Sequence, residues 1–303
     1  MKNREAKNIP ASVQSRLLTQ ARSRGRPYQE LLEYYAIERF LYRMSLSKHR
    51  QAFVLKGALL FQAWGFAEFR PTRDIDLLGY TTNEIVNLVE IVKEICQLPV
   101  QGDGVVFDPE SVRAERINEA ADYQGIRLRF QGRLGKIHLP MQIDVGFADV
   151  VSPAPITLKY PVLLSMPAPE LRGYPPETVV AEKFQAMVFL GEINSRMKDF
   201  FDLWVLASRF AVEGSTLQRA VAETFAKRHT PTAIDIPALT DRFASEKQIQ
   251  WTAFVKRSHL EQAPANLSEA NSLLRGFLMP VMEACLKNAD MTGTWSPGGP
   301  WSR

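Results

Sequence analysis

Two aspartates stand inside what otherwise reads as a buried strand, in the segment RPTRDIDLL at residues 70–78. Asp74 and Asp76 are two positions apart, and residues at that spacing on a strand point to the same face of a sheet. Asp144 lies in a second apolar segment, MQIDVGF. If the two strands are neighbours in one sheet, the three carboxylates converge on one face.

Carboxylates that lie so close repel one another unless a positive charge stands between them. Mg²⁺ prefers hard oxygen ligands and usually keeps waters and substrate phosphates in its shell. We therefore predict that Asp74, Asp76 and Asp144 hold Mg²⁺ or Mn²⁺ against a nucleotide and an attacking hydroxyl. The alternative, an ordinary turn or surface use of the Asp-x-Asp pair, stays open at this point.

The segment LKGALLF supplies a second feature, a glycine between a short apolar strand and a helix. At such a junction, backbone N–H groups and a helix N-terminus can face a phosphate, so Gly57 is a phosphate-binding candidate. Arg70 and Arg73 either contact phosphate or balance the acidic cluster. Thr72 either contacts phosphate or orients the turn.

Lys183 falls within the apolar stripe of the helical segment PPETVVAEKFQAMVFLG, among Val180, Phe184 and Met187. A lysine among core-facing positions is costly unless it is paired or extends to water. It either reaches a nucleotide phosphate or extends its ammonium into solvent.

Asp199 and Asp202 are three residues apart, hence on one helix face. They suit a site that fixes a lysine or deprotonates a hydroxyl. Alternatively, Asp202 and Lys198 form an exposed salt bridge.

The pattern along the chain predicts helices, then mixed strands and helices, then helices again. We expect helices over 10–46, a helix after an N-cap at Thr82, a hairpin over 125–147, and an irregular connection over 161–171. The expected division is an N-terminal helical cap (1–50), a core (51–170), a helical C-terminal domain (171–290) and a flexible tail (291–303). The fold class is therefore α+β.

Charge and composition restrict the binding partners and the cellular location that we expect for the protein. The first fifty residues hold eleven Lys and Arg against four Asp and Glu, an excess that suits nucleic acid, a solvated helix face or an acidic partner. The sequence shows no apolar run long enough for a membrane span, no secretory signal, and only Cys96 and Cys285. We expect a cytoplasmic protein that does not contact membranes.

Four blocks in order, FVLKGALLFQAW…RPTRDIDLL, IDVGF, PPETVVAEKFQAM and RMKDFFDL, resemble the AbiEii/AbiGii-type nucleotidyltransferases, which include toxins of type IV abortive-infection toxin–antitoxin systems. The resemblance covers about residues 50 to 210. It implies a polymerase-β-like core of a mixed sheet with flanking helices, and Mg²⁺-dependent transfer of NMP from an NTP. It also implies a tRNA 3′ end as acceptor, and it leads us to expect a helix-turn-helix antitoxin.

By position, Gly57 matches the glycine signature, and Asp74 and Asp76 match the metal-binding pair. Lys183 matches the lysine of the third motif, and Asp199 and Asp202 match the acidic fourth motif. One departure is Gly57-Ala58, where many relatives carry Gly-Gly or Gly-Ser. The expected catalytic residues are Asp74, Asp76, Asp144, Lys183, Asp199 and Asp202, and the expected nucleotide-binding residues are Lys56, Gly57, Arg70, Thr72, Arg73, Lys183 and Lys198.

Two other readings remain from the sequence. The same fold and metal site serve enzymes that modify a protein or a small molecule. A non-catalytic NTP-binding or partner-binding module would also carry these residues.

Overall fold

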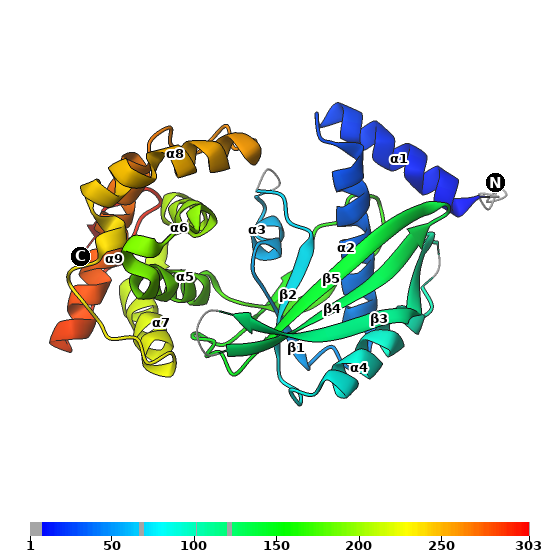
Figure 1. Ribbon diagram of the computed structural model, residues 1–303, viewed down its shortest axis with the longest axis horizontal. Helices are drawn as coiled ribbons and strands as arrows, with labels where there is room; N and C mark the ends of the chain where they lie inside the picture. Colours follow the sequence, from blue (N-terminus) through cyan, green and yellow to red (C-terminus); the bar gives the residue numbers. More distant parts are fainter. Residues whose placement is uncertain (1–7, 67–69, 101, 120–122, 303) are drawn as a thin grey trace. The chain divides into compact units, whose positions relative to one another are not determined.

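The computed structural model describes residues 8–66, 70–100, 102–119 and 123–302. Residues 1–7 of the expected N-terminal cap therefore lie outside the described residues. The contacts divide the chain into two compact units (Figure 1): unit 1 contains residues 1–148 and 156–173, and unit 2 contains 149–155 and 174–303. The expected division into four parts stays a prediction.

Unit 1 is a seven-stranded mixed sheet with helices, in the strand order β3-β4-β5-β2-β1-β7-β6. The β2–β5 and β1–β7 pairs are parallel, and the other pairs are antiparallel. The expected mixed sheet with flanking helices is confirmed. The elements are α1 (Ile9–Ser23), α2 (Tyr28–Leu46), β1 (Phe53–Lys56), α3 (Leu59–Ala63), β2 (Asp74–Gly79), α4 (Ile85–Gln97), β3 (Val105–Glu119), β4 (Tyr123–Leu134), β5 (Ile137–Phe147), β6 (Ile156–Lys159) and β7 (Glu170–Gly173).

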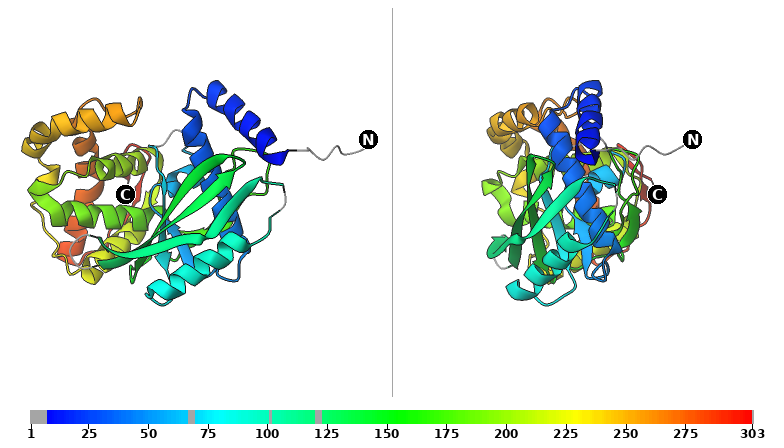
Figure 2. Two further views of the ribbon diagram at one scale, coloured as in Figure 1. Left: turned by 45° about the vertical axis from the view of Figure 1, so that its right-hand side comes forward. Right: turned by 90° about the vertical axis from the view of Figure 1, so that its right-hand side faces the viewer.

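The two faces of the outer strands differ because apolar and polar residues alternate along them. Phe40 of α2 packs with its ring centroid 5.0 Å from that of Phe130 in β4 and 5.6 Å from that of Phe107 in β3. Helix α4 lies along β3, and α2 passes behind β3–β5 in Figure 1. Figure 2 shows the same helices from two other directions. The apolar core of unit 1 therefore lies on the side of α2 and α4, and the polar residues of these strands face the other way.

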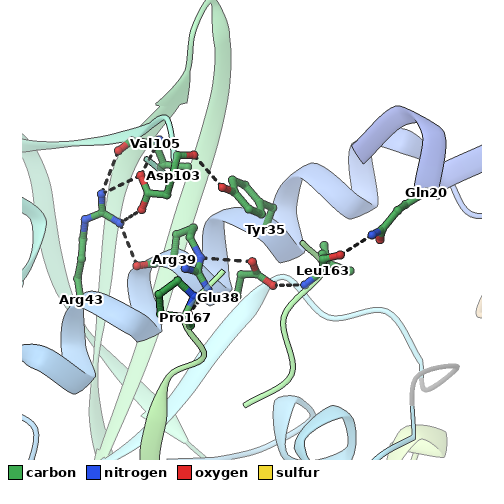
Figure 3. A network of polar contacts seen from close by, with 9 residues as sticks. All are labelled: Gln20, Tyr35, Glu38, Arg39, Arg43, Asp103, Val105, Leu163 and Pro167. Atoms are coloured by element: carbon green, nitrogen blue, oxygen red, sulfur yellow. Dashed lines mark hydrogen bonds and ion pairs between the residues drawn. The ribbon is translucent and has the colours of Figure 1, made fainter. Parts of the chain in front are cut away.

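Helix α2 also carries buried charges into this core (Figure 3). Arg43 donates hydrogen bonds of 2.6 and 3.3 Å to both carboxylate oxygens of Asp103. Arg39 donates to the carbonyl of Pro167, and Glu38 accepts from the backbone N–H of Leu163 at 2.7 Å. The basic excess of the N-terminal region is thus partly internal, because two of its arginines hold the helix to neighbouring segments.

Unit 2 is mainly helical and includes a small three-stranded sheet in the order β10-β9-β8. Its helices correspond to the helical pattern predicted after residue 174. The elements are α5 (Pro176–Leu190), η1 (Gly191–Ile193), α6 (Met197–Arg209), β8 (Val212–Glu213), α7 (Gly214–Lys227), η2 (Pro237–Leu239), α8 (Asp241–Arg257), α9 (Leu267–Lys287), β9 (Thr294–Trp295) and β10 (Trp301–Ser302). Among the described residues, none of the helices combines the length and apolar character needed to cross a membrane.

Three local predictions differ from the structure. Helix α4 begins after Glu84 without a side-chain cap, so Thr82 is not its N-cap. The prolines of segment 161–171 led us to expect an irregular connection there. Strand β7 nevertheless starts inside this segment. The expected flexible tail is instead packed: Trp295 is buried and donates from Nε1 to the carbonyl of Ala207.

Candidate active site

Strand pairing brings the three predicted metal-binding aspartates to one face of the sheet. In the parallel β2–β5 pair, Asp76 is opposite Asp144 and Asp74 is opposite Gln142. Neighbouring strands are about 4.8 Å apart. Asp74 and Asp76 are half-buried, and Asp144 is buried. The polar face of β2 and β5 therefore carries a compact acidic cluster, as the spacing of the aspartates in the two segments predicted.

A basic residue that the sequence analysis missed holds the third aspartate. Arg127 of β4 lies opposite Asp144 and donates hydrogen bonds of 2.8 and 2.7 Å from Nε and Nη2 to the two carboxylate oxygens. This hydrogen bonding raises the pKa of Arg127, and the charges of Asp144 and Asp74 act in the same direction. The sequence signal is the alternation of arginines with apolar residues in GIRLRF, which predicts a strand but does not identify the partner of Arg127.

Gly57 leaves the space that the Asp76 carboxylate occupies. Its φ is +73°, a conformation that L side chains rarely adopt. A Cβ built on Gly57 would stand 2.0 Å from Oδ2 of Asp76. The preceding residue, Lys56, is buried at the end of β1 and is the cross-strand partner of Asp76. The glycine is therefore required for the position of the carboxylate, in addition to the turn into α3.

The three predicted residues before β2 lie close to α2. The backbone N–H of Thr72 donates to the hydroxyl of Tyr34 at 3.2 Å, and Arg73 Nε lies 2.9 Å from Glu33 Oε2. Burial raises the pKa of Tyr34, while the charge of Arg70 acts in the opposite direction. The Arg73 side chain is 76% exposed, so this ion pair contributes little free energy and does not prevent Arg73 from contacting phosphate.

Lys183, Asp199 and Asp202 form a second cluster, which lies within unit 2. Lys183 Nζ is 2.7 Å from both Asp199 Oδ1 and Asp202 Oδ2. Arg196 Nε is 2.7 Å from Asp199 Oδ2, although without the alignment of a hydrogen bond. Both aspartates are buried, so an exposed salt bridge is not the explanation of Asp202. The two aspartates therefore fix the position of Lys183. Lys198 is exposed on α6, the helix that carries both aspartates.

The residues of unit 1 fit a divalent cation held by two carboxylates. Asp74 and Asp76 present hard oxygen atoms, which leaves the remaining ligand positions of Mg²⁺ to water and phosphate. Within the described part of the chain, no three His, Cys, Asp or Glu residues are arranged as a metal site. Asp144 binds Arg127 through both oxygens, and each oxygen keeps a second lone pair that can contact a cation or accept a proton.

Comparison with known proteins identifies a family for this chain. The model of the nucleotidyl transferase AbiEii toxin family of type IV toxin–antitoxin systems matches residues 39–274, a range that contains every expected site residue. The solved structure of JHP933 from Helicobacter pylori is 14% identical and aligns over 86% of this chain and 95% of its own, with a TM-score of 0.48. A second H. pylori structure, described as a candidate nucleotidyltransferase, is 14% identical and aligns over 88% of this chain and 100% of its own, also with a TM-score of 0.48. No curated protein matches the sequence.

The chain is a nucleotidyltransferase, because the model of a nucleotidyltransferase family spans most of it. It belongs to the AbiEii toxin family of type IV toxin–antitoxin systems. Membership implies an NTP substrate and an antitoxin partner. The reading as a non-catalytic binding module is thereby replaced by that of an enzyme.

Proposed function

We propose that this protein transfers NMP from an NTP to the 3′-terminal hydroxyl of tRNA in a Mg²⁺-dependent reaction in the cytoplasm, and that its antitoxin is a helix-turn-helix protein. The observation that supports this reaction is the register of β2 and β5, with Asp74, Asp76 and Asp144 on one sheet face. We assign unit 1 to a polymerase-β-like core on the same ground.

Asp74 and Asp76 hold the divalent ion, which supplies positive charge to the triphosphate when it is bound. Asp144 accepts the proton of the acceptor hydroxyl. The hydroxyl oxygen then attacks the α-phosphorus in line, the bond from that phosphorus to the bridging oxygen breaks, and pyrophosphate leaves. Positioning and electrostatic stabilisation supply most of the acceleration in such reactions.

We propose that Lys183 takes part in the reaction as a cation, and that Asp199 and Asp202 fix the position of its ammonium group within unit 2. Ion pairs of 2.7 Å to both carboxylates support the second part of this assignment. A Lys183→Met variant tests the first part: we expect a higher KM for NTP or a lower kcat.

The deciding experiment incubates the purified protein with each labelled NTP, Mg²⁺ and total tRNA. We expect label from one NTP or a few in tRNA, and a loss of at least about 100-fold in Asp76→Asn. Asp290→Asn is the matched control, because Asp290 is an exposed aspartate in the C-terminal segment, outside the acidic cluster. Label in protein or in a small molecule, with none in RNA, would replace the tRNA assignment.

Expression in growing cells tests the toxin role independently. The parent chain should arrest growth, and a folded Asp76→Asn variant should not. Arrest that persists with the folded variant contradicts toxicity by nucleotidyl transfer. Co-expression of a helix-turn-helix protein encoded beside the gene should restore growth.

A further inference from the structure

Strand β4 presents a line of long polar side chains on the face that carries the acidic cluster. Arg127, Arg129, Gln131 and Arg133 occupy alternate positions, so all four point to this face, about 7 Å apart along the strand. The residues that alternate with them include Leu128, Phe130 and Leu134, which are buried on the opposite side. The polar line is therefore a property of one face of the strand.

The line begins at the acidic cluster and ends at the β4–β5 turn. Arg127, at one end, binds Asp144, and Arg133, near the other end, is the cross-strand partner of His138. Gln131, Arg133 and His138 are exposed, as is Lys136 in the turn. Any chain that follows β4 toward Asp144 passes these side chains in order.

The charges on this line remain available to a ligand. Arg129 bonds to Glu115 of β3 at 2.7 Å, but both side chains are 54% exposed. An ion pair so exposed contributes about 1 kcal/mol or less, so a phosphate can replace the carboxylate at small cost. Within the described residues, Arg133 has no acidic partner. Phe40 of α2 packs on Phe130, which points to the opposite face of β4.

We infer that the β4 line of Arg129, Gln131 and Arg133 binds the single-stranded 3′ segment of the acceptor RNA, with its phosphates on the two arginines and its terminal hydroxyl at Asp144. This inference rests on the proposed function. Arginines match phosphodiesters in charge and geometry, and their regular spacing suits a linear polyanion. Arg127 remains hydrogen-bonded to Asp144, so it lies on β4 between the RNA-binding residues and the acidic cluster.

This surface differs from the one that the sequence suggested for nucleic acid. Two arginines of the basic N-terminal region, Arg39 and Arg43, are buried and are therefore not accessible to RNA. Arg26, which precedes α2, forms an ion pair with Glu30 in the first turn of that helix. The β4 line lies beside the acidic cluster in the same sheet, so it can deliver a hydroxyl to that cluster.

The test is RNA binding by Arg129→Ala/Arg133→Ala in the Asp76→Asn background, which prevents turnover. The probe is a 5′-fluorescein tRNA, and anisotropy gives Kd at several salt concentrations. Each phosphate contact on a single strand contributes about 0.7 to the slope of log Kd against log salt. We expect Kd to rise about tenfold or more and the slope to fall by about 1.4. The variant Arg129→Lys/Arg133→Lys keeps both positive charges, so it should retain most of the slope of log Kd against log salt.

Arg116→Ala is the matched control, because Arg116 is an exposed arginine of β3 that points to the opposite face, where it donates to Asn83. This control should bind RNA like the parent. Both substituted arginines are exposed, so the melting temperature should stay within about 3 °C of the parent. An unchanged Kd and slope in the double Ala variant would overturn the β4 assignment. If the parent itself bound no RNA but labelled another acceptor, the proposed tRNA acceptor would fail first.

Discussion

Gly57 shows how a single missing side chain positions a carboxylate. Two separate constraints act on it: a positive φ of +73°, and an approach of 2.0 Å between a would-be Cβ and Asp76 Oδ2. Gly25 shares only the first constraint, because its φ is +62° and nothing lies within 4 Å of its would-be Cβ. Substitutions at Gly25 and Gly57 therefore distinguish the cost of backbone strain, which both share, from displacement of the Asp76 carboxylate, which only Gly57 involves.

Gly57→Ala should lower nucleotidyl transfer by about 100-fold, since the new methyl group must displace Asp76 from its position. Gly25→Ala should cost about 1 kcal/mol of stability from backbone strain and leave transfer intact. Transfer rates and urea unfolding curves of both variants measure the difference. Equal activity in the two variants would show that the approach to Asp76 has no functional role.

At the scale of elements, helix α7 depends on a carboxylate at its start. Glu213 accepts hydrogen bonds from the backbone N–H groups of Ser215 and Thr216, at 3.1 and 2.8 Å, and from their hydroxyls. The hydroxyl of Ser215 and then that of Thr216 lower the pKa of Glu213 to about 2. The cap therefore stays ionised at every ordinary pH.

Glu213→Ala should destabilise the protein by about 1 kcal/mol at neutral pH, as loss of an N-cap usually does. Because the folded-state pKa is depressed, this stabilisation is present above the ordinary value of 4.5 and is lost as the pH falls toward 2. Urea denaturation at pH 7 and pH 2.5 measures it, with the exposed Glu261→Ala as control. A constant difference at the two pH values would contradict the capping role.

At the scale of the molecule, the buried charges of α2 link stability to pH. Burial raises the pKa of Glu38 to about 8, while Arg39 and the backbone N–H of Leu163 act against that shift. The folded protein therefore keeps a proton on Glu38 over a pH range in which the unfolded chain has released it. Stability from this group is greatest below pH 4.5 and declines as the pH rises toward 8.

Glu38→Gln should remove this decline, since the amide does not titrate. The melting temperature of the variant relative to the parent should increase by about 5 °C between pH 5 and pH 8. Only the change with pH is diagnostic, because loss of a partner for Arg39 adds a constant penalty. Parallel melting profiles of parent and variant would refute the raised pKa, and exposed Glu90→Gln serves as the control.

Several features of the fold were predictable because they depend on neighbours in sequence. Alternation in GIRLRF predicted β4, and the strand–glycine–helix pattern around Gly57 predicted β1 and α3. The pairing of Asp144 with Arg127 was not predictable, because the register of β4 against β5 selects that partner. The packing of Trp295 was also missed, since a Gly- and Pro-rich segment shows no periodicity even when a single aromatic anchors it.

By itself the sequence determined which residues share a face: Asp74 with Asp76 on one strand, and Asp199 with Asp202 on one helix, since side-chain direction repeats with the local backbone period. Tertiary structure alone decided that β5, rather than any nearer strand, lies beside β2, and that Lys183 meets both helix aspartates. Strand pairing and ion pairs between distant segments depend on the packing of the whole unit, which no local pattern encodes.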